Sequence, residues 1–532
     1  SRFSRGTVET PPSQFRALLS PPVSTAAAAA YAVFACFFVA GRVGAYGPNH
    51  GDVAIWIPMH EWMSRGAVLY ESVWDHKDWG FFWLSHPFYR LMGIEGLYLA
   101  AFLAVVAFGF GVYLCIRAFT SSRTGSVVAS TAALTYTAAP SFWSIFTENL
   151  SSGLLVLAIG LSIRTPFVGG LIWALSASVK VAGAGLLVAA LATIVISAAI
   201  SAPSRDRRVL LRQAARLLAG FIVGAALVVL AALITGSLLG WVDVITYNRE
   251  YSQSRGFPPS GPISQMPGLV TQAVTEDIRA LGQHQFFYVA ALVVSILALS
   301  SIAFAQRKGR GESLIGQDEP ERVTAVSAVV ALAALFVTLA QRPSPQHWQY
   351  FVGPAVLLIS VLFVRVRKHG TSGGTFVRIL AVVLLFLPLA LSVYFDRSML
   401  PRGILDRGIA LTYFAQGGVL GDELRQVPPD STLSFYGIND ERVDVAQLPD
   451  SGVLACPLIV QFPWYSPRYD TAIEQCIQNR PDYVVVGTEI WGTDAWQGAL
   501  SRLLESEYVQ CAENEPTREL WVRAGGTCSS GR

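Results

Sequence analysis

The segment "GAVLYESVWDHKDWGFFW", residues 66–83, concentrates charge in a chain that has little of it. Asp75, His76, Lys77 and Asp78 follow one another directly, with tryptophan and phenylalanine on both sides. Of the 532 residues, 52% are hydrophobic and only 14% are charged, against about 25% charged residues in an ordinary soluble domain. A surface exposed to water needs more polar residues than this, whereas lipid covers most of a polytopic membrane protein. The composition therefore predicts a membrane protein that displays this segment at one of its surfaces.

Apolar runs long enough to cross a bilayer recur along the chain, which predicts about eleven spanning helices. They are residues 23–44, 94–116, 124–140, 147–163, 166–180, 182–201, 214–235, 286–306, 323–340, 350–364 and 376–395. The division of residues 161–194 stays open, because this stretch can be cut in more than one way. The run 23–44 is interpreted as a retained span, because no small-residue cleavage site with a polar start follows it. The net charge of +3 is too small to indicate a nucleic-acid partner.

The positively charged residues gather in alternate loops, which predicts the direction of the chain across the membrane. With a cytoplasmic N-terminal segment, 1–22, one set of loops holds Arg117, Arg123, Arg164, Arg205, Arg207, Arg208, Arg212, Arg307, Lys308, Arg310, Arg365, Arg367 and Lys368. The outer face then receives the loops 45–93, 141–149, 236–285 and 341–349, and everything after residue 395. Six of the seven histidines fall there: His50, His60, His76, His86, His284 and His347. We expect the protein in the cell membrane, with polar chemistry on its extracytoplasmic side.

The tail, residues 396–532, has a different pattern from the spanning region, residues 23–395. "STLSFYG", "GVLACPLIVQF" and "PDYVVVG" are short strand-like runs. "AWQGALSRLLESE" places Leu500, Leu503 and Leu504 on one face of an amphipathic helix. The fold class predicted is thus a polytopic α-helical membrane protein with a small extracytoplasmic α/β domain at its C-terminus.

Four cysteines lie in this tail: Cys456, Cys476, Cys511 and Cys528. An oxidising compartment permits disulfides among them, and four cysteines allow three complete pairings between which sequence does not choose. The pairs Cys456–Cys476 and Cys511–Cys528 are favoured here, because short loops close most readily. Zinc-ribbon spacing is absent from the sequence, which argues against metal in the tail.

The first outer loop begins with a carboxylate that has two interpretations. Asp52 directly follows the first span, and residues 53–65 read as an amphipathic helix along the membrane interface, with Trp56 and Trp62 as aromatic anchors. Asp52 stands at the start of this helix, where an N-cap residue is normal. It is either a cap or a functional carboxylate.

Lys77 also has two interpretations. A lysine among aromatic residues at the membrane surface can snorkel towards water and anchor the loop. It can equally bind a lipid phosphate as a compact point charge. The acidic residues beside it favour the second interpretation, because a plain anchor does not need carboxylates.

Other ionisable residues stand at the outer ends of spans or in the loop 236–285. Glu148, Lys180 and His347 indicate a shared polar cavity, since charge at membrane depth normally faces a cavity or a partner. The alternative is three separate helix ends at the water boundary. The loop 236–285 is long, polar and rich in Gly and Pro, which favours a lid over the cavity. Its expected contacts are Tyr247, Arg249, Tyr251 and Arg255, and a plain solvated loop is the alternative.

The order of these features resembles the GT-C superfamily of polytopic glycosyltransferases. An acid after the first span, a helix, and "GAVLYESVWDHKDWGFFW" are similar to the first outer loop of the branch that contains protein mannosyltransferase-like enzymes and lipid A aminoarabinose transferases. "TEN" at 147–149, "SVK" at 178–180 and "PSPQHWQYFVGP" at 343–354 are similar to later signatures of that branch. The resemblance covers residues 20–395, and a soluble domain after the last span is a habit of the group.

The resemblance implies a transfer of sugar from a polyprenyl phosphate to a glycan, lipid or protein acceptor outside the cytoplasm, with inversion. Carried over by position, Asp52 is the general base that takes the acceptor's proton. Lys77 holds the leaving phosphate. Weaker phosphate contacts are His347 and Lys180, and the residues expected to orient the substrates are Asp75, His76, Asp78 and Glu148. No cofactor and no essential metal are expected.

Two other functions also fit a membrane protein with charged residues near its outer face. A secondary transporter is one, although no internal repeat of the kind common in transporters is visible in the sequence. A non-catalytic membrane subunit that has kept the fold is the other.

Overall fold

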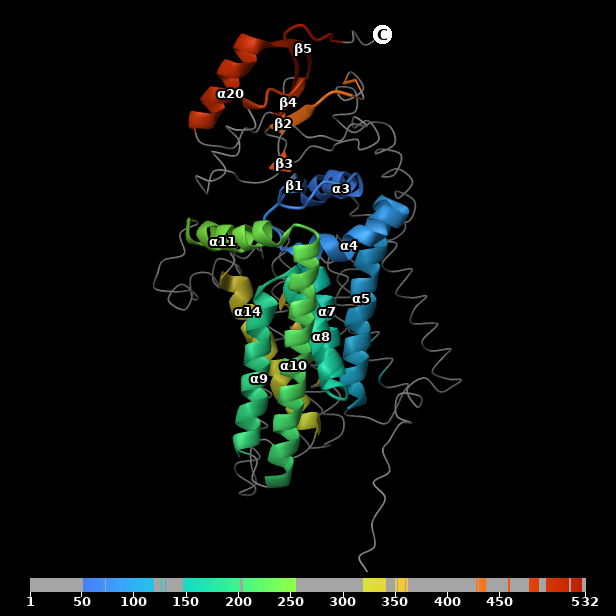
Figure 1. Ribbon diagram of the computed structural model, residues 1–532. Coiled ribbons are helices and arrows are strands. Elements are labelled where there is room, and N and C mark those ends of the chain that lie inside the picture. The colour runs from blue at the N-terminus through green and yellow to red at the C-terminus, as the bar shows by residue number, and fades with distance from the viewer. Residues whose placement is uncertain are drawn as a thin grey trace, which may run out of the picture.

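The computed structural model describes residues 51–71, 73–118, 126, 130, 147–200, 204–254, 319–340, 350–351, 353–358, 360–361, 427–428, 430–436, 458–459, 478–487, 494–515 and 518–528. This part of the chain is mostly helical, with a four-stranded sheet near the C-terminus. In Figure 1 a bundle of long helices runs alongside one another, shorter helices lie across one end, and the sheet stands beyond them.

The bundle helices follow the predicted spans closely. They are α5 (Ile94–Arg117), α7 (Thr147–Ser162), α8 (Pro166–Val179), α9 (Ala182–Ile200), α10 (Ser204–Ile234) and α14 (Glu319–Ala340). The middle part of the chain, whose division into helices the sequence left open, therefore forms three helices: α7, α8 and α9. Pro166 at the start of α8 explains one break, because a proline is well placed in a first turn and poorly placed further in. The predicted spans 23–44, 286–306 and 376–395, and nearly all of 124–140, lie outside the described residues.

Two of these helices are long and apolar enough to cross a membrane, α5 over Ile94–Arg117 and α10 over Arg207–Ile234. On α10, large apolar side chains face outward, with Leu227 57%, Leu233 60% and Ile234 77% exposed. A soluble protein would bury such a helix face, whereas lipid covers it in a membrane. The exposed face of α10 thus supports the membrane location that the composition predicts.

The first outer loop is largely helical. Within residues 45–93 the structure contains α3 (Gly51–Ser64), the short strand β1 (Val73–Trp74) and α4 (Trp79–Met92). Asp52 lies inside α3, after Gly51, so the interpretation of Asp52 as an N-cap is wrong: a cap residue stands before the helical backbone.

The tryptophans of this segment do not anchor it to lipid. Trp56 and Trp62 are 1% and 3% exposed, and Trp74 and Trp79 are also buried, all in one core shared with Phe81. The expected helix is confirmed by α3, but the expectation that Trp56 and Trp62 anchor it at the membrane interface is wrong. Rings that pack edge to face, as Trp56 does on Phe81 with centroids 4.7 Å apart, bury large apolar area and hold the segment rigidly.

Small residues let the bundle helices approach closely. A Cβ atom added at Gly170 of α8 would lie 2.1 Å from the carbonyl oxygen of Leu217 on α10. At Gly220 of α10 it would lie 1.9 Å from the carbonyl oxygen of Phe167. Such contacts between backbones are typical of packed helices in membranes.

Replacement of Gly170 by valine should therefore separate α8 from α10. We expect a loss of about 1–3 kcal/mol, the usual cost of overpacking, seen as a lower midpoint of thermal unfolding in detergent. The control is Gly185→Ala on α9, where an added Cβ meets nothing within 4 Å among the described residues. Equal midpoints for the two variants would contradict the close contact.

The described tail forms a sheet with the strand order β2-β4-β6-β5. The strands are β2 (Leu433–Tyr436), β4 (Tyr483–Gly487), β6 (Arg518–Arg523) and β5 (Tyr508–Glu515), with α20 (Asp494–Glu507) before β5. β2 and β4 are parallel, and β6 runs antiparallel to β4 and to β5. The predicted strands at 431–437 and 481–487 and the predicted helix are confirmed, whereas β5 and β6 were not predicted.

A disulfide links two parts of the described tail, and a short strand of the tail pairs with the first outer loop. A disulfide joins Cys511 to Cys528, which confirms the second favoured pair; Cys456 and Cys476 lie outside the described residues. The third predicted strand contributes β3 (Leu458–Ile459), which does not join the sheet. It pairs in parallel with β1, Val73 opposite Leu458 and Trp74 opposite Ile459. The tail thus contacts the chain directly before Asp75.

Candidate functional site

The acidic residue that follows β1 is completely buried and held from two sides. Asp75 is 0% exposed. Its Oδ2 atom accepts a hydrogen bond from the indole Nε1 of Trp56 on α3, at 3.2 Å. Its Oδ1 atom accepts one from the backbone N–H of Lys77, at 2.8 Å. The carboxylate therefore fixes both the turn that carries Lys77 and the distance of that turn from α3.

The lysine side chain in this turn is held without a carboxylate partner. Lys77 Nζ lies 2.8 Å from Nε2 of His76 and 5.6 Å from the ring centre of Trp56. The ion pairs among the described residues do not include Lys77. Tyr70 donates a hydrogen bond to the backbone oxygen of Lys77 at 2.6 Å. The half-buried Lys77 side chain thus contacts an imidazole and an indole, while Asp78 acts on it through charge alone.

A second lysine at this end of the bundle is paired instead. Lys180, directly after α8, donates to Oε1 of Glu148 in the first turn of α7 at 2.7 Å. The other carboxylate oxygen accepts from Thr147, also at 2.7 Å. Lys180 and Glu148 are 8% and 4% exposed. The structure brings together these two predicted cavity residues, and the third, His347, lies outside the described residues.

Asp78 joins three parts of the fold. Its Oδ2 atom accepts a hydrogen bond from the backbone N–H of Val181 at 2.9 Å, and its Oδ1 atom accepts from the indole of Trp241 at 3.1 Å. Burial raises its pKa to about 6, and the two hydrogen bonds counteract part of that rise. Both oxygens are used by the fold. A further role for Asp78 in orienting a substrate stays a prediction.

The first part of the loop 236–285, the expected lid, is a helix that packs against the charged turn. Residues 238–254 form α11, which lies across the end of the bundle in Figure 1. Tyr247 is 3% exposed, and its ring packs edge to face on Trp74 with centroids 5.1 Å apart. The first third of the loop is thus a helix and not an irregular segment, and the role of the loop as a lid stays a prediction. Arg249 and Tyr251 belong to α11 by their backbone, and Arg255 lies outside the described residues.

Sequence reasoning missed two residues that α11 supplies. Trp241 binds Asp78, and Asn248 donates from Nδ2 to the backbone oxygen of His76 at 2.8 Å. The signal was available: Trp241, Val244 and Asn248 recur at the three- and four-residue spacing of one helix face. The loop's many glycines and prolines follow residue 254 and hid this shorter helical stretch.

The position of Asp52 relative to this cluster follows from helix geometry. Asp52 and Trp56 are four residues apart in α3, so the two positions share one face, about one turn apart. Trp56 is the residue through which α3 contacts Asp75 and Lys77. Position 52 therefore lies on the face of α3 that meets the charged turn.

Two buried histidines lie further along the same pair of helices. The rings of His60 on α3 and His86 on α4 stack with centroids 5.7 Å apart, and His60 Nε2 lies 3.3 Å from the hydroxyl of Ser85. Burial, with a smaller effect of His86, lowers the pKa of His60 to about 3. In the folded protein His60 therefore stays neutral between about pH 6.5 and pH 3, a range in which the same residue in the unfolded chain is protonated.

This neutral histidine should make the protein sensitive to acid. Below the ordinary histidine pKa of about 6.5, the unfolded chain binds a proton at His60 that the folded protein does not bind. The free energy of unfolding therefore falls as the pH falls from 6.5 towards 3. At pH 5 the expected loss from His60 is about 2 kcal/mol. Thermal unfolding at pH 7 and pH 5 measures it, and His60→Gln, which keeps a group near Ser85 but does not titrate, should reduce the difference. An unchanged difference in that variant would contradict a neutral His60.

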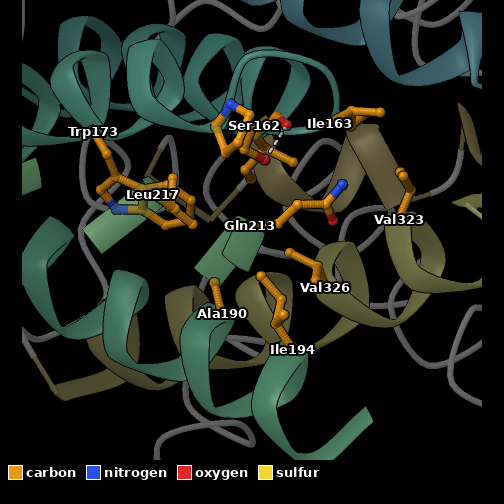
Figure 2. Close-up of a pocket in the computed structure, with 11 residues that line it drawn as sticks. Ser162, Ile163, Trp173, Ala190, Ile194, Gln213, Leu217, Val323 and Val326 are labelled. Atoms are coloured by element: carbon orange, nitrogen blue, oxygen red, sulfur yellow. Dashed lines mark hydrogen bonds between the residues drawn. The ribbon is translucent and has the colours of Figure 1, made fainter. Parts of the chain in front are cut away.

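The cavity in Figure 2 does not belong to this polar cluster. It is small, about 30 Å³, and its lining is mainly apolar, with Ser162 and Gln213 among the labelled side chains. Ser162 is the last residue of α7, whereas Glu148 lies in its first turn, and the step of 14 residues from one to the other corresponds to about 21 Å of helix. A space of this size holds about one water, so we assign it no substrate.

Within the described ranges, no three His, Cys, Asp or Glu side chains gather as metal ligands would. Whether the complete site needs a metal stays a prediction, as does the absence of a cofactor.

No family model matches the chain, and no curated protein matches it. Several solved structures resemble it, including the following three. ArnT from Cupriavidus metallidurans, bound to undecaprenyl phosphate, is 12% identical with a TM-score of 0.45, over 96% of this chain and 98% of that one. The oligosaccharyltransferase of Archaeoglobus fulgidus tethered to an acceptor peptide is 12% identical with a TM-score of 0.42, over 92% and 73%. The same enzyme with Zn and sulfate is 13% identical with a TM-score of 0.43, over 92% and 72%.

Both neighbours are glycosyltransferases of the GT-C class that the sequence motifs resemble. With TM-scores below 0.5, this likeness carries no argument about the chemistry of the present chain.

Proposed function

We propose that this protein is a membrane glycosyltransferase that moves a sugar from a polyprenyl phosphate to an acceptor outside the cytoplasm. One observation carries the proposal: among the described residues, the ammonium of Lys77 forms no ion pair with a carboxylate, and it lies against the face of α3 on which position 52 falls. A cation for a phosphate and a carboxylate for a hydroxyl are the two groups that a direct sugar transfer requires. The motif resemblance of the first outer loop agrees with this assignment.

Lys77 is the better phosphate ligand of the two lysines. Lys180 already donates to the carboxylate of Glu148 at 2.7 Å, so the negative charge of Glu148 offsets the positive charge that would attract a phosphate. Lys77 donates to an imidazole and interacts with Asp78 only through charge, without an ion pair among the described residues, so more of its attraction for an anion remains than at Lys180. Lys180 and Glu148 then support the wall of the site, and His347 remains a proposed contact from the predicted outer turn 341–349.

The reaction follows from these roles. Asp52 accepts the proton of the acceptor hydroxyl as its oxygen bonds to the anomeric carbon. The bond from that carbon to the phosphate oxygen breaks, and the electron pair leaves with the phosphate, whose growing charge Lys77 stabilises. A single displacement inverts the anomeric centre. The chemistry of these residues needs no nucleotide, and the sequence has no glycine-rich phosphate loop.

The proposed arrangement in the cell is the one that the arginine pattern predicts. Residues 1–22 lie in the cytoplasm, 23–395 form the membrane domain, and 396–532 form the extracytoplasmic domain. The acceptor, a glycan, lipid or protein, meets the donor at the outer face. The disulfide between Cys511 and Cys528 agrees with an oxidising compartment for the tail.

Cysteine labelling tests this orientation. A single cysteine introduced at Ser204, the first residue of α10, should resist a membrane-impermeant maleimide added to intact cells and react after the cells are opened. A cysteine at Ser501, in α20, should react in intact cells. The opposite labelling pattern would overturn the orientation and remove the site from the outer face.

The function itself is tested by donor binding and turnover. Undecaprenyl phosphate, the lipid in the ArnT structure, serves as the binding probe for purified protein in detergent. We expect saturable binding that depends on Lys77, and release of polyprenyl phosphate when membranes supply sugar-charged lipid and acceptor. Movement of the whole lipid-linked sugar without cleavage would favour a transporter. Binding without cleavage under any acceptor mixture would favour a non-catalytic subunit.

A further inference from the structure

The His76 ring lies between the carboxylate of Asp75 and the ammonium of Lys77, and these two neighbours indicate which ring nitrogen carries the proton. An ammonium only donates hydrogen bonds. At 2.8 Å from Lys77 Nζ, the Nε2 atom of His76 therefore accepts and carries no proton. The ring proton then sits on Nδ1, which lies 3.4 Å from Oδ1 of Asp75. Asp75 itself is fixed by Trp56 and by the backbone of Lys77.

We propose that His76 is the acid that protonates the departing phosphate, with Asp75 as its positioning residue. The inference rests on the proposed function, because it concerns the phosphate that Lys77 binds. When Lys77 turns its ammonium to a phosphate oxygen, Nε2 of His76 loses the donor that occupies it. A proton from solvent then binds Nε2, and the buried carboxylate of Asp75 stabilises the imidazolium that results.

The transfer then balances. The bond between the anomeric carbon and the phosphate oxygen breaks, and the proton of Nε2 passes to the phosphate, which leaves as a monoanion of the polyprenyl monoester. The acceptor's proton goes to Asp52 in the same displacement. His76 returns to the neutral form that again accepts from Lys77. The site begins and ends with the same number of protons once Asp52 releases its proton to solvent.

The surroundings of the ring agree with this role. The titratable groups beside it, Asp75 and Lys77, belong to its own turn, with Tyr70 and Asp78 flanking that turn. Among the contacts of the described residues, α3 presents Trp56 and α11 presents Asn248, which donates to the backbone oxygen of His76. Neither of these two side chains titrates. Asn248 fixes the backbone while the ring stays half-buried, within reach of a ligand.

Proton uptake on binding tests the proposal without an acceptor or an identified sugar. Undecaprenyl phosphate is titrated into the full-length protein at pH 7.5, in two buffers of different ionisation enthalpy. The difference in heat gives the number of protons taken up. We expect the wild type to take up close to one proton more than His76→Gln. Asp75→Asn should take up less than half of that extra proton, because the imidazolium loses its carboxylate.

Controls separate this inference from the proposed function. His369→Gln, in the predicted cytoplasmic loop, should behave as the wild type. Thermal unfolding shows first which variants fold; if Asp75→Asn does not, His76→Gln and His76→Asn carry the test alone. Equal proton uptake by wild type and His76→Gln, with binding intact, overturns the acid role of His76 only. Absence of saturable binding by the wild type overturns the phosphate site itself, and with it both proposals.

Discussion

Asp52→Asn should lower the transfer rate by about 10³–10⁴-fold, towards the upper end of the contribution of a positioned base. Asparagine keeps the size of the side chain and its place on α3 but cannot take a proton from the acceptor hydroxyl. Affinity for undecaprenyl phosphate should stay within about twofold of the wild type, because the base faces the acceptor and not the leaving group. Single-turnover rates and lipid binding on the same preparation measure the two effects.

Asp243→Asn is the matched control. Asp243 is an exposed carboxylate on α11, and its substitution changes the charge by the same amount. A normal rate in Asp52→Asn would remove the base from this position. A fall in both rate and lipid binding would instead show that position 52 supports the donor side of the site.

Lys77→Gln should weaken donor binding and slow transfer together. The contact with phosphate strengthens as the sugar–oxygen bond breaks, and removal of a preorganised group of this kind costs about 10²–10³ in rate, or about 3–4 kcal/mol. If Lys77 merely anchored the loop to lipid, Lys77→Gln would leave transfer nearly intact. The structure favours the first result, because the side chain turns inward to His76 and Trp56.

Lys77→Arg sharpens this experiment. Arginine keeps the charge but replaces a compact ammonium by a planar fork, so it should restore part of the binding and little of the rate. Full activity in the arginine variant would show that only charge matters at this position. Unchanged affinity for undecaprenyl phosphate in Lys77→Gln would exclude Lys77 from the site.

Part of the site could not be deduced from sequence, for identifiable reasons. Trp56 and Trp62 look like interface anchors because tryptophan is common at membrane surfaces, yet here they are buried among Phe81 and its neighbours. Composition does not distinguish an aromatic side chain against lipid from one against protein. The sequence ranks Lys180 below Lys77 only through the family resemblance, whereas the structure shows a physical difference: Lys180 is paired with Glu148, 32 residues away.

The sequence by itself predicted the positions of most described bundle helices, because length and apolar content are local properties that lipid imposes on each segment separately. It also determined the charged turn at residues 75–78 as the place of interest, because charge is rare elsewhere. The tertiary structure decided which charges remain available. It paired Lys180 with Glu148, engaged Asp78 with Val181 and Trp241, and left Lys77 against His76. Those outcomes depend on contacts between segments up to 163 residues apart, for which no local pattern exists.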